Sequence, residues 1–552
     1  MIKNKIIELL EKAAAEAQAQ GLLPPVTLPE ITLEHPPNER FGDYASSLPL
    51  RLERAVHMKP LDIAKILVRL LPATEEIEKV SVAPPGFINF VLKNSWLGCQ
   101  VDCVLAEGSG YGNQELSKGS SVQVEYVSVN PTGPLHVGHG RGAILGSTLS
   151  KVLDAAGYAV TKEYYVNNAG TQMQVFYHSL YARYLQALGR EAELPANGYQ
   201  GEYVKEIAQQ IIAETGDKFL RMPAEQAVAE VGNIGLQKVV AAIRADLDLM
   251  CVDFDVWFSE QSLFDGGQYQ KAMSLLAERG YTAVKEGATW FASTALGEDK
   301  DNVLVRSNGA PTYFASDVAY HYNKFVERKF DRVINIWGAD HQGHVSRMKA
   351  VVSALGIDPS RLQIIIGQMV SLKRGDVLVK ASKRKGEIVT LRELVEEVGP
   401  DVCRFFFLSR SADAQMDFDL ALAKEQSENN PVYYVQYAHA RIASILRLAQ
   451  EKGIDFSQGD TCLLTHPAEL SLIRKILLLP ELVESIALNL EPHHLPHYAQ
   501  DLATSFHSFY KQCRVVSDDE ALTPARLKLV QATKIVLART LDLMGMTAPE
   551  KM

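Results

Sequence analysis

The chain has 552 residues, more than one hydrophobic core usually organises, and its 47% hydrophobic and 22% charged content is that of a folded protein, neither disordered nor fibrous. A formal net charge of -10 argues against a broadly basic surface, so any contact with nucleic acid is expected to be local. No apolar run is long enough to predict a membrane span. Charged residues interrupt every apolar run in residues 1–21, which predicts an amphipathic helix instead of a signal peptide, and a cytoplasmic protein.

The cysteines and one group of histidines are the candidate metal ligands in the sequence. The six cysteines are scattered without a C-x-x-C pair, which favours free thiols and argues against a zinc site. His493, His494 and His497 lie close together, but Pro492 and Pro496 interrupt them. We therefore expect these histidines to begin a helix, and we expect no metal site built by the protein.

The first residues predict a small α+β domain over residues 1–110. A helix over residues 1–21 precedes a proline-rich stretch and a helical pattern over residues 50–71. Residues 80–91 then alternate apolar and polar side chains around a Pro-Pro-Gly turn, which is typical of paired strands.

The pattern changes to a parallel α/β fold over residues 111–395. A β-rich segment at residues 122–127, a Gly- and Pro-containing loop, a helix over residues 143–156 and a strand over residues 158–166 form a βαβ unit. Such a unit predicts a doubly wound, Rossmann-like parallel sheet. We expect a helical insertion at about residues 175–250, more strands at residues 332–337 and 362–366, and a C-terminal all-α bundle over residues 396–552.

The loop of the βαβ unit contains the turn His136-Val137-Gly138-His139. In doubly wound folds ligands bind at this position, where a helix N-terminus offers free N–H groups to phosphate. Gly138 leaves room for a nucleotide to approach the backbone, and the two imidazoles supply donors that stabilise charge on an α-phosphate. The alternative interpretation is a pair of solvated histidines in a glycine-rich turn.

A second candidate element is the basic segment Lys380-Ala381-Ser382-Lys383-Arg384-Lys385-Gly386. The chain lacks the G-x-x-x-x-G-K-[ST] pattern of P-loop enzymes, so another element must bind the phosphates of the nucleotide. Lysines in a mobile loop can follow charge onto a leaving pyrophosphate. The alternative interpretation is a solvated basic surface loop.

Together these stretches resemble the HIGH and KMSKS signatures of class I aminoacyl-tRNA synthetases, and further stretches resemble the arginyl-tRNA synthetases of bacteria. The matching segments span nearly the whole chain: residues 130–139, 164–170, 313–317, 338–344, 401–406 and 430–441. Ala381 departs from the family pattern because it replaces the usual methionine, while both lysines of the signature are retained.

The resemblance implies roles for individual residues. His136, His139, Lys380, Ser382 and Lys383 would be catalytic, with His136, Gly138, His139 and Lys383 binding ATP. Arginine would be bound by Ser128, Asn130, His139, Glu125, Glu260, Tyr313, Asp317 and His341. Carboxylates gripping a guanidinium suit its forked geometry. The alternative is that Asp317 and Tyr313 only begin a helix.

The resemblance also implies the partners: L-arginine, ATP carrying Mg²⁺, and tRNA(Arg), bound by a monomer that forms arginyl-adenylate only with tRNA present. Phe87 and Asn89 would contact a flipped base at the tRNA corner, unless Phe87 lies in a small core and Asn89 in a turn. Two rivals stay open: a synthetase for another amino acid, such as glutamate or cysteine, and an inert tRNA-binding paralogue.

Overall fold

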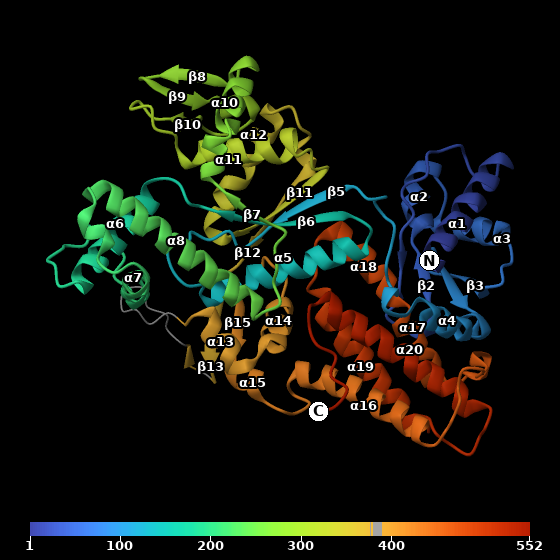
Figure 1. Cartoon of the computed structure of the whole chain (residues 1–552). Coiled ribbons are helices and arrows are strands. Elements are labelled where there is room, and N and C mark those ends of the chain that lie inside the picture. The colour runs from blue at the N-terminus through green and yellow to red at the C-terminus, as the bar shows by residue number, and fades with distance from the viewer. Residues whose placement is uncertain (376, 379–388) are drawn as a thin grey trace.

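The computed structural model describes residues 1–375, 377–378 and 389–552. Within them the chain forms an N-terminal α+β unit, a parallel sheet with helices on both faces, and a C-terminal helical bundle (Figure 1). The fold class predicted from the sequence is confirmed. None of the described helices combines the length and hydropathy that a membrane span needs.

The N-terminal unit packs its helices on a four-stranded antiparallel sheet of order β1-β2-β4-β3. The expected helix over residues 50–71 is two helices, because His57 takes a left-handed conformation and Pro60 begins the next helix. The elements are α1 (Ile2–Ala19), β1 (Leu33–Glu34), β2 (Tyr44–Ser46), α2 (Leu48–Val56), α3 (Pro60–Leu70), β3 (Ile77–Ala83), β4 (Phe87–Leu92) and α4 (Asn94–Glu107).

The central sheet is entirely parallel and has the order β12-β11-β5-β6-β7. The chain moves from β5 outward through β6 and β7, then returns to the other side of β5 with β11 and β12, so the switch point lies between β5 and β11. The strands are β5 (Ser121–Glu125), β6 (Ala159–Val166), β7 (Val256–Ser259), β11 (Arg332–Gly338) and β12 (Leu362–Gly367).

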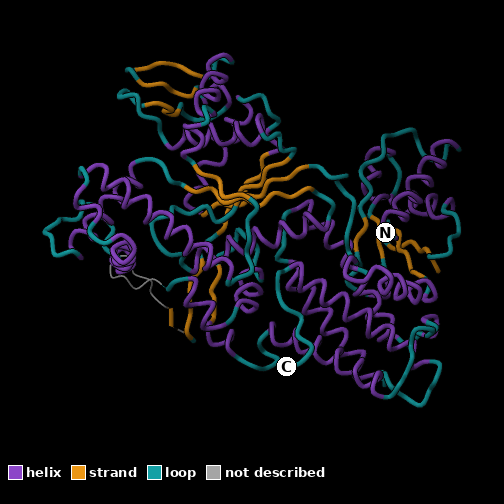
Figure 2. The backbone as a smooth tube through the Cα atoms, viewed as in Figure 1, coloured by secondary structure: helices purple, strands orange, loops and turns teal. Residues whose placement is uncertain are grey.

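Helices cover both faces of this sheet, as Figure 2 shows. Ile334 and Ile336 of β11 belong to the core formed with α5 (Val137–Ala155), whereas Val333 belongs to the core formed with α11 (Tyr313–Tyr322) and α12 (Val345–Ala354). The alternation of buried side chains along β11 therefore places α5 on one face and α11 and α12 on the other.

Two groups of elements are inserted between the strands. The helices α6 (Thr171–Ala187), α7 (Glu202–Thr215) and α8 (Ala224–Asp248) follow β6 and form the helical insertion. A three-stranded antiparallel sheet, which the sequence pattern did not reveal, follows β7 at the outer edge of the molecule (Figure 1). Its strands are β8 (Thr282–Lys285), β9 (Ala288–Phe291) and β10 (Asn302–Val305), and they follow the helices α9 (Gln261–Asp265) and α10 (Gln268–Glu278).

The expectation that the chain is helical from residue 400 to its end was wrong in one place. β15 (Met416–Asp419) pairs in parallel with β13 (Val370–Arg374), which also pairs with β14 (Val377–Leu378). The helices are α13 (Leu391–Val398), α14 (Pro400–Leu408), α15 (Leu420–Lys424), α16 (Pro431–Glu451), α17 (Pro467–Ile476), α18 (Leu478–Asn489), α19 (His494–Gln512) and α20 (Leu522–Leu543). As expected, His493 and His494 stand at the start of α19.

The packing of α5 on the sheet depends on Gly146. A Cβ atom at this position would lie 2.2 Å from Cγ of the buried Tyr126. We expect Gly146→Ala to destabilise the protein by about 2 kcal/mol, the usual cost of overpacking a core, and to lower its thermal melting midpoint. Gly142→Ala on the same helix is the control, because nothing lies within 4 Å of its added Cβ. Equal midpoints for the two variants would contradict this packing.

Candidate active site

The histidine turn lies at the switch point of the sheet, directly beyond the carboxyl end of β5. His136 is the N-cap of α5, and His139 returns a side-chain hydrogen bond: the His136 N–H donates to His139 Nδ1 over 3.2 Å. Their rings are 3.4 Å apart, centroid to centroid. Because Nδ1 of His139 accepts this hydrogen bond, the proton of the neutral ring is on Nε2. Nε2 of His139 can therefore act as a hydrogen-bond donor.

Gly138 lies in close contact with the first imidazole of the turn. A Cβ atom there would lie 3.1 Å from Cε1 of His136, so a side chain at this position would require a small shift of that ring. The backbone before the turn is strained, because Val127 and Ser128 both have positive φ angles, 67° and 40°. Left-handed residues other than glycine cluster at functional sites.

The segment that follows the basic stretch is attached to the histidine turn. His136 and Thr390 form an isolated antiparallel β-bridge, and the Leu391 N–H donates to the Leu135 carbonyl over 2.8 Å. Thr390 also caps α13 through a reciprocal contact with Glu393. The predicted loop residues themselves lie outside the described residues: Lys380, Ala381, Ser382 and Lys383.

Arg141, one turn into α5, is a structural cation that the sequence analysis missed. Its buried guanidinium donates to the carbonyl oxygens of Gln368, Ser411 and Ala414 at 3.1, 2.7 and 2.7 Å. Its backbone partners are more than two hundred residues away in the chain, so no local pattern announces them. The contact fixes the start of α5 against the segments that lead into β13 and β15.

Three acidic side chains lie near one another at the carboxyl ends of β7 and β5 and on the first turns of α11; this acidic cluster consists of Glu260, Glu125 and Asp317. Glu260 is 3% exposed, and its Oε2 has no hydrogen-bond partner among the described residues. Burial raises the pKa of Glu260, and burial together with Glu260 and Glu125 raises the pKa of Asp317 to about 7. The mutual repulsion of these carboxyl groups is therefore part of the reason for the raised pKa of Asp317.

Tyr313 lies near this acidic cluster. It is 54% exposed, and its ring passes over Gly170, where an added Cβ would lie 3.6 Å from the phenolic oxygen. It comes one helical turn before Asp317, so both side chains lie on the same side of α11. The ring of Tyr313 therefore lies on the side of α11 that carries Asp317, and partial burial together with the nearby Glu260 carboxylate raises the pKa of Tyr313.

Glu125 has a partner that the sequence analysis did not foresee. The Lys324 ammonium, 0% exposed, lies 2.6 Å from Glu125 Oε2 and donates to Asn335 Oδ1 over 2.9 Å. Asn335 in turn contacts His321, whose Nδ1 is 2.8 Å from the Asp317 carbonyl oxygen. One oxygen of Glu125 is thus engaged inside the protein, and Lys324 sits in a π-helical turn of the kind often found at functional sites.

Ser128 and Asn130 lie on the loop between β5 and the histidine turn. The Tyr165 N–H donates to Ser128 Oγ over 3.1 Å, and Asn130 Nδ2 donates to Gln172 Oε1 over 2.9 Å. His341 is exposed beyond the carboxyl end of β11, with its Nε2 3.5 Å from an Asp340 oxygen. Its ring lies 5.9 Å from the rings of Trp337 and of His344, which are neighbours on the same segment, and among the described residues it makes no hydrogen bond or ion pair with the acidic cluster.

The two residues expected to touch tRNA lie on β4. Phe87 and Asn89 share the strand face opposite to Ile88 and Phe90, which are fully buried in the core. Phe87 is partly buried, and Asn89 is 4% exposed between β2 and β3. Phe87 therefore offers more surface to a base than Asn89 does. Among the described residues no group of three His, Cys, Asp or Glu side chains is arranged to hold a metal ion.

Three family models match the chain in succession. They are described as "Arginyl tRNA synthetase N terminal domain" over residues 2–92, "tRNA synthetases class I (R), catalytic domain" over residues 100–404 and "DALR anticodon binding domain" over residues 435–552. The parallel sheet, its histidine turn and the helical bundle thus define a class I aminoacyl-tRNA synthetase.

Similar proteins narrow this class. The arginine–tRNA ligase of Dehalococcoides mccartyi is 59% identical over 551 residues, 100% of this chain and 99% of the relative. A structure titled as a putative arginyl-tRNA synthetase from Campylobacter jejuni is 32% identical with a TM-score of 0.77, covering 84% of this chain and 100% of that one. The Thermus thermophilus arginyl-tRNA synthetase shares the fold, with a TM-score of 0.81 at 23% identity and full coverage of both chains. The chain belongs to the arginine–tRNA ligase family, which confirms the family predicted from the sequence.

Proposed function

We propose that this chain, which charges tRNA(Arg) with arginine, carries out both steps of that reaction at the carboxyl ends of β5, β6, β7 and β11. In the first step the arginine carboxylate attacks the α-phosphate of ATP, which gives arginyl-adenylate and releases pyrophosphate. In the second step the terminal ribose of the tRNA takes the arginyl group, and AMP leaves. The observation that carries this proposal is the histidine turn at the switch point, together with the acidic cluster at the carboxyl ends of β5 and β7 and on α11.

His136, Gly138 and His139 form the ATP site in this proposal. The N-terminus of α5 directs N–H groups at the α-phosphate, and the two imidazoles donate to oxygens that gain charge as the carboxylate attacks. The reciprocal capping contacts support this assignment because they hold both rings before ATP arrives. Lys380, Ser382 and Lys383 would follow the charge onto the pyrophosphate, and Mg²⁺ would enter as a substrate ion on the ATP phosphates.

The acidic cluster is the arginine site in this proposal. Asp317 and Glu260 would accept the forked guanidinium, and Tyr313 would pack on its plane. Ser128, Asn130, His139 and His341 would hold the backbone end of arginine. Glu125 would act there with its remaining oxygen, while its ion pair with Lys324 offsets part of the negative charge of the cluster.

The outer domains would bind tRNA. We assign residues 1–110, with Phe87 and Asn89, to the corner of the tRNA, residues 111–395 to catalysis, and residues 396–552 to the anticodon. The enzyme would act as a cytoplasmic monomer. Light scattering of the purified chain would test the monomer, and a dimer mass would contradict it.

A charging assay with arginine, lysine or glutamate tests the proposed reaction. We expect only arginine to be transferred to tRNA(Arg), because the point charge of lysine cannot fill a site built for a planar fork and glutamate meets like charges. Pyrophosphate exchange is expected to require tRNA. Absence of arginyl transfer would support an inert paralogue, and robust exchange without tRNA would refute the tRNA requirement.

A further inference from the structure

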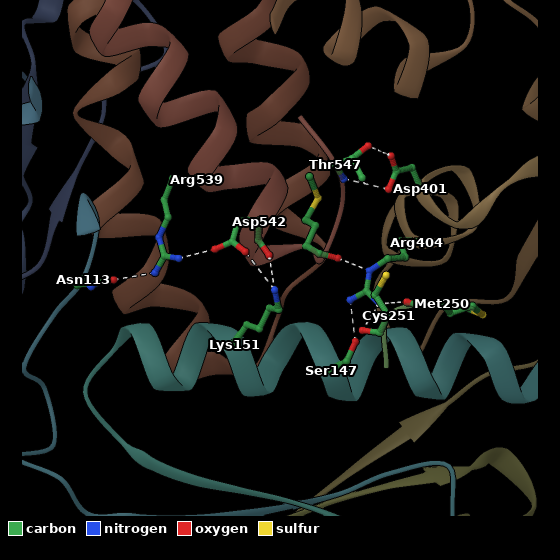
Figure 3. A network of polar contacts seen from close by, with 11 residues as sticks. Asn113, Ser147, Lys151, Met250, Cys251, Asp401, Arg404, Arg539, Asp542 and Thr547 are labelled. Carbon is green, nitrogen blue, oxygen red and sulfur yellow. Dashed lines mark hydrogen bonds and ion pairs between the residues drawn. The ribbon is translucent and has the colours of Figure 1, made fainter. Parts of the chain in front are cut away.

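Arg404 of α14 is a fully buried cation whose partners come from three separate parts of the fold. Its guanidinium donates to the backbone carbonyls of Met250 and Met544 and, over 2.8 Å, to Ser147 Oγ (Figure 3). Met250 follows α8 of the helical insertion, and Met544 follows α20 of the anticodon-binding domain. Ser147 belongs to α5, the helix that begins at the histidine turn.

The charge of this arginine is balanced by backbone instead of by a carboxylate bonded to it. Both carbonyls lie just beyond helix C-termini, where the peptide dipoles gather partial negative charge. Burial lowers the pKa of Arg404 to about 10, so the side chain stays charged at neutral pH. Gly545 has a positive φ of 71°, which allows the chain to turn tightly here. A side chain at this position is also excluded, because its Cβ atom would lie 2.4 Å from the guanidinium.

Two further contacts strengthen the same junction. Asp401, one turn before Arg404, accepts hydrogen bonds from the N–H and hydroxyl of Thr547. Lys151 of α5 donates to the carbonyl and carboxylate oxygens of Asp542, at the end of α20 (Figure 3). The end of α20 is therefore attached to α5 directly and through α14.

We propose that Arg404 is a positioning residue that couples tRNA bound on the anticodon-binding domain to the histidine turn. Ser147 lies eleven residues after His136, so about 16 Å of continuous helix joins the guanidinium to the turn. A helix of that length moves as a rigid rod, and a shift of α20 therefore changes the position of the imidazoles. The inference rests on the catalytic role proposed for His136.

Ser147→Ala tests the coupling, because it removes one acceptor of Arg404 and leaves the helix intact. Charging would be measured with tRNA(Arg) and with a transcript whose anticodon is fully replaced. We expect Ser147→Ala to lower kcat for tRNA(Arg) about tenfold, a usual strength of coupling between sites, and to leave its KM within about twofold of the native value. The ratio of kcat for tRNA(Arg) to kcat for the altered transcript should fall by the same factor. Arg404→Lys, which keeps the charge but loses the fork, should act in the same direction.

Ser150→Ala is the matched control, because Ser150 Oγ donates to the Gly146 carbonyl within α5 over 2.8 Å and has no other hydrogen bond to the described part of the chain. It should charge both tRNAs as the native enzyme does. Equal behaviour of Ser147→Ala and Ser150→Ala would overturn the coupling, as would a native enzyme that charges both tRNAs with equal kcat. His136→Asn, assayed in parallel, separates the two claims: if it is fully active, the catalytic role proposed for the turn fails instead.

Discussion

Replacing Asp317 by asparagine is expected to raise the KM for arginine about a thousandfold, because losing one partner of a buried charge pair costs about 2–5 kcal/mol. The amide keeps the shape of the side chain and removes the charge that the guanidinium meets. Steady-state charging at varied arginine concentration measures this effect. Asp265→Asn, an exposed change on α9, is the control and should leave KM unchanged.

The pKa of Asp317 adds a pH dependence to the same prediction. Because the pKa is about 7, arginine affinity should rise as the pH increases from about 6 to 8 and then level off, and this rise should be absent in Asp317→Asn. The folded protein holds this proton more tightly than the unfolded chain, so the carboxyl group lowers stability as pH rises from about 4 to 7. Without arginine, Asp317→Asn should therefore melt at a higher temperature than the native enzyme at pH 8. An unchanged KM for arginine in this variant would show that Asp317 does not bind the guanidinium.

The second large effect concerns His136. His136→Asn is expected to lower kcat about 10²- to 10³-fold, the usual loss when one donor aimed at a developing charge is removed. Asparagine is a good N-cap, so α5 should keep its start and the loss should be chemical. Pyrophosphate exchange in the presence of tRNA(Arg) measures it, and the KM for ATP should change little.

His178→Asn, on the exposed face of α6, is the control for this substitution. It should leave kcat and the melting midpoint as they are. A His136→Asn enzyme with native kcat would show that the turn binds ATP without stabilising the reacting phosphate.

The strands around the switch point could be predicted from the sequence because they are buried, β-rich and longer than four residues. β5, β6, β11 and β12 lie close to the expected ranges. β15 was missed, since its four residues alternate exposed and buried positions next to helices, and its partner β13 is more than forty residues earlier. Pairing at that distance leaves no local signal.

Tyr313 and Asp317 could be proposed as site residues from the sequence, because they stand in a stretch that resembles a known family. The roles of the buried cations Arg141, Lys324 and Arg404 could not be predicted from the sequence. Each one is defined by partners that only the folded chain supplies: backbone carbonyls for the two arginines, and a carboxylate 199 residues away for the lysine. A basic residue in a sequence usually indicates a solvated surface, so burial of this kind is found only in a structure.

The contacts of Arg404 also affect how the chain folds while it is being synthesised. Its guanidinium needs the carbonyl of Met544, 140 residues further along the chain, and no shorter nascent chain can supply that acceptor. Domains generally fold as units, N-terminal first, during synthesis. The parallel sheet can therefore form early, but a buried cation at its margin stays incompletely bonded until translation is almost complete. Nascent chains that stop before Met544 should be cut by proteases near α14, whereas chains that include it should resist.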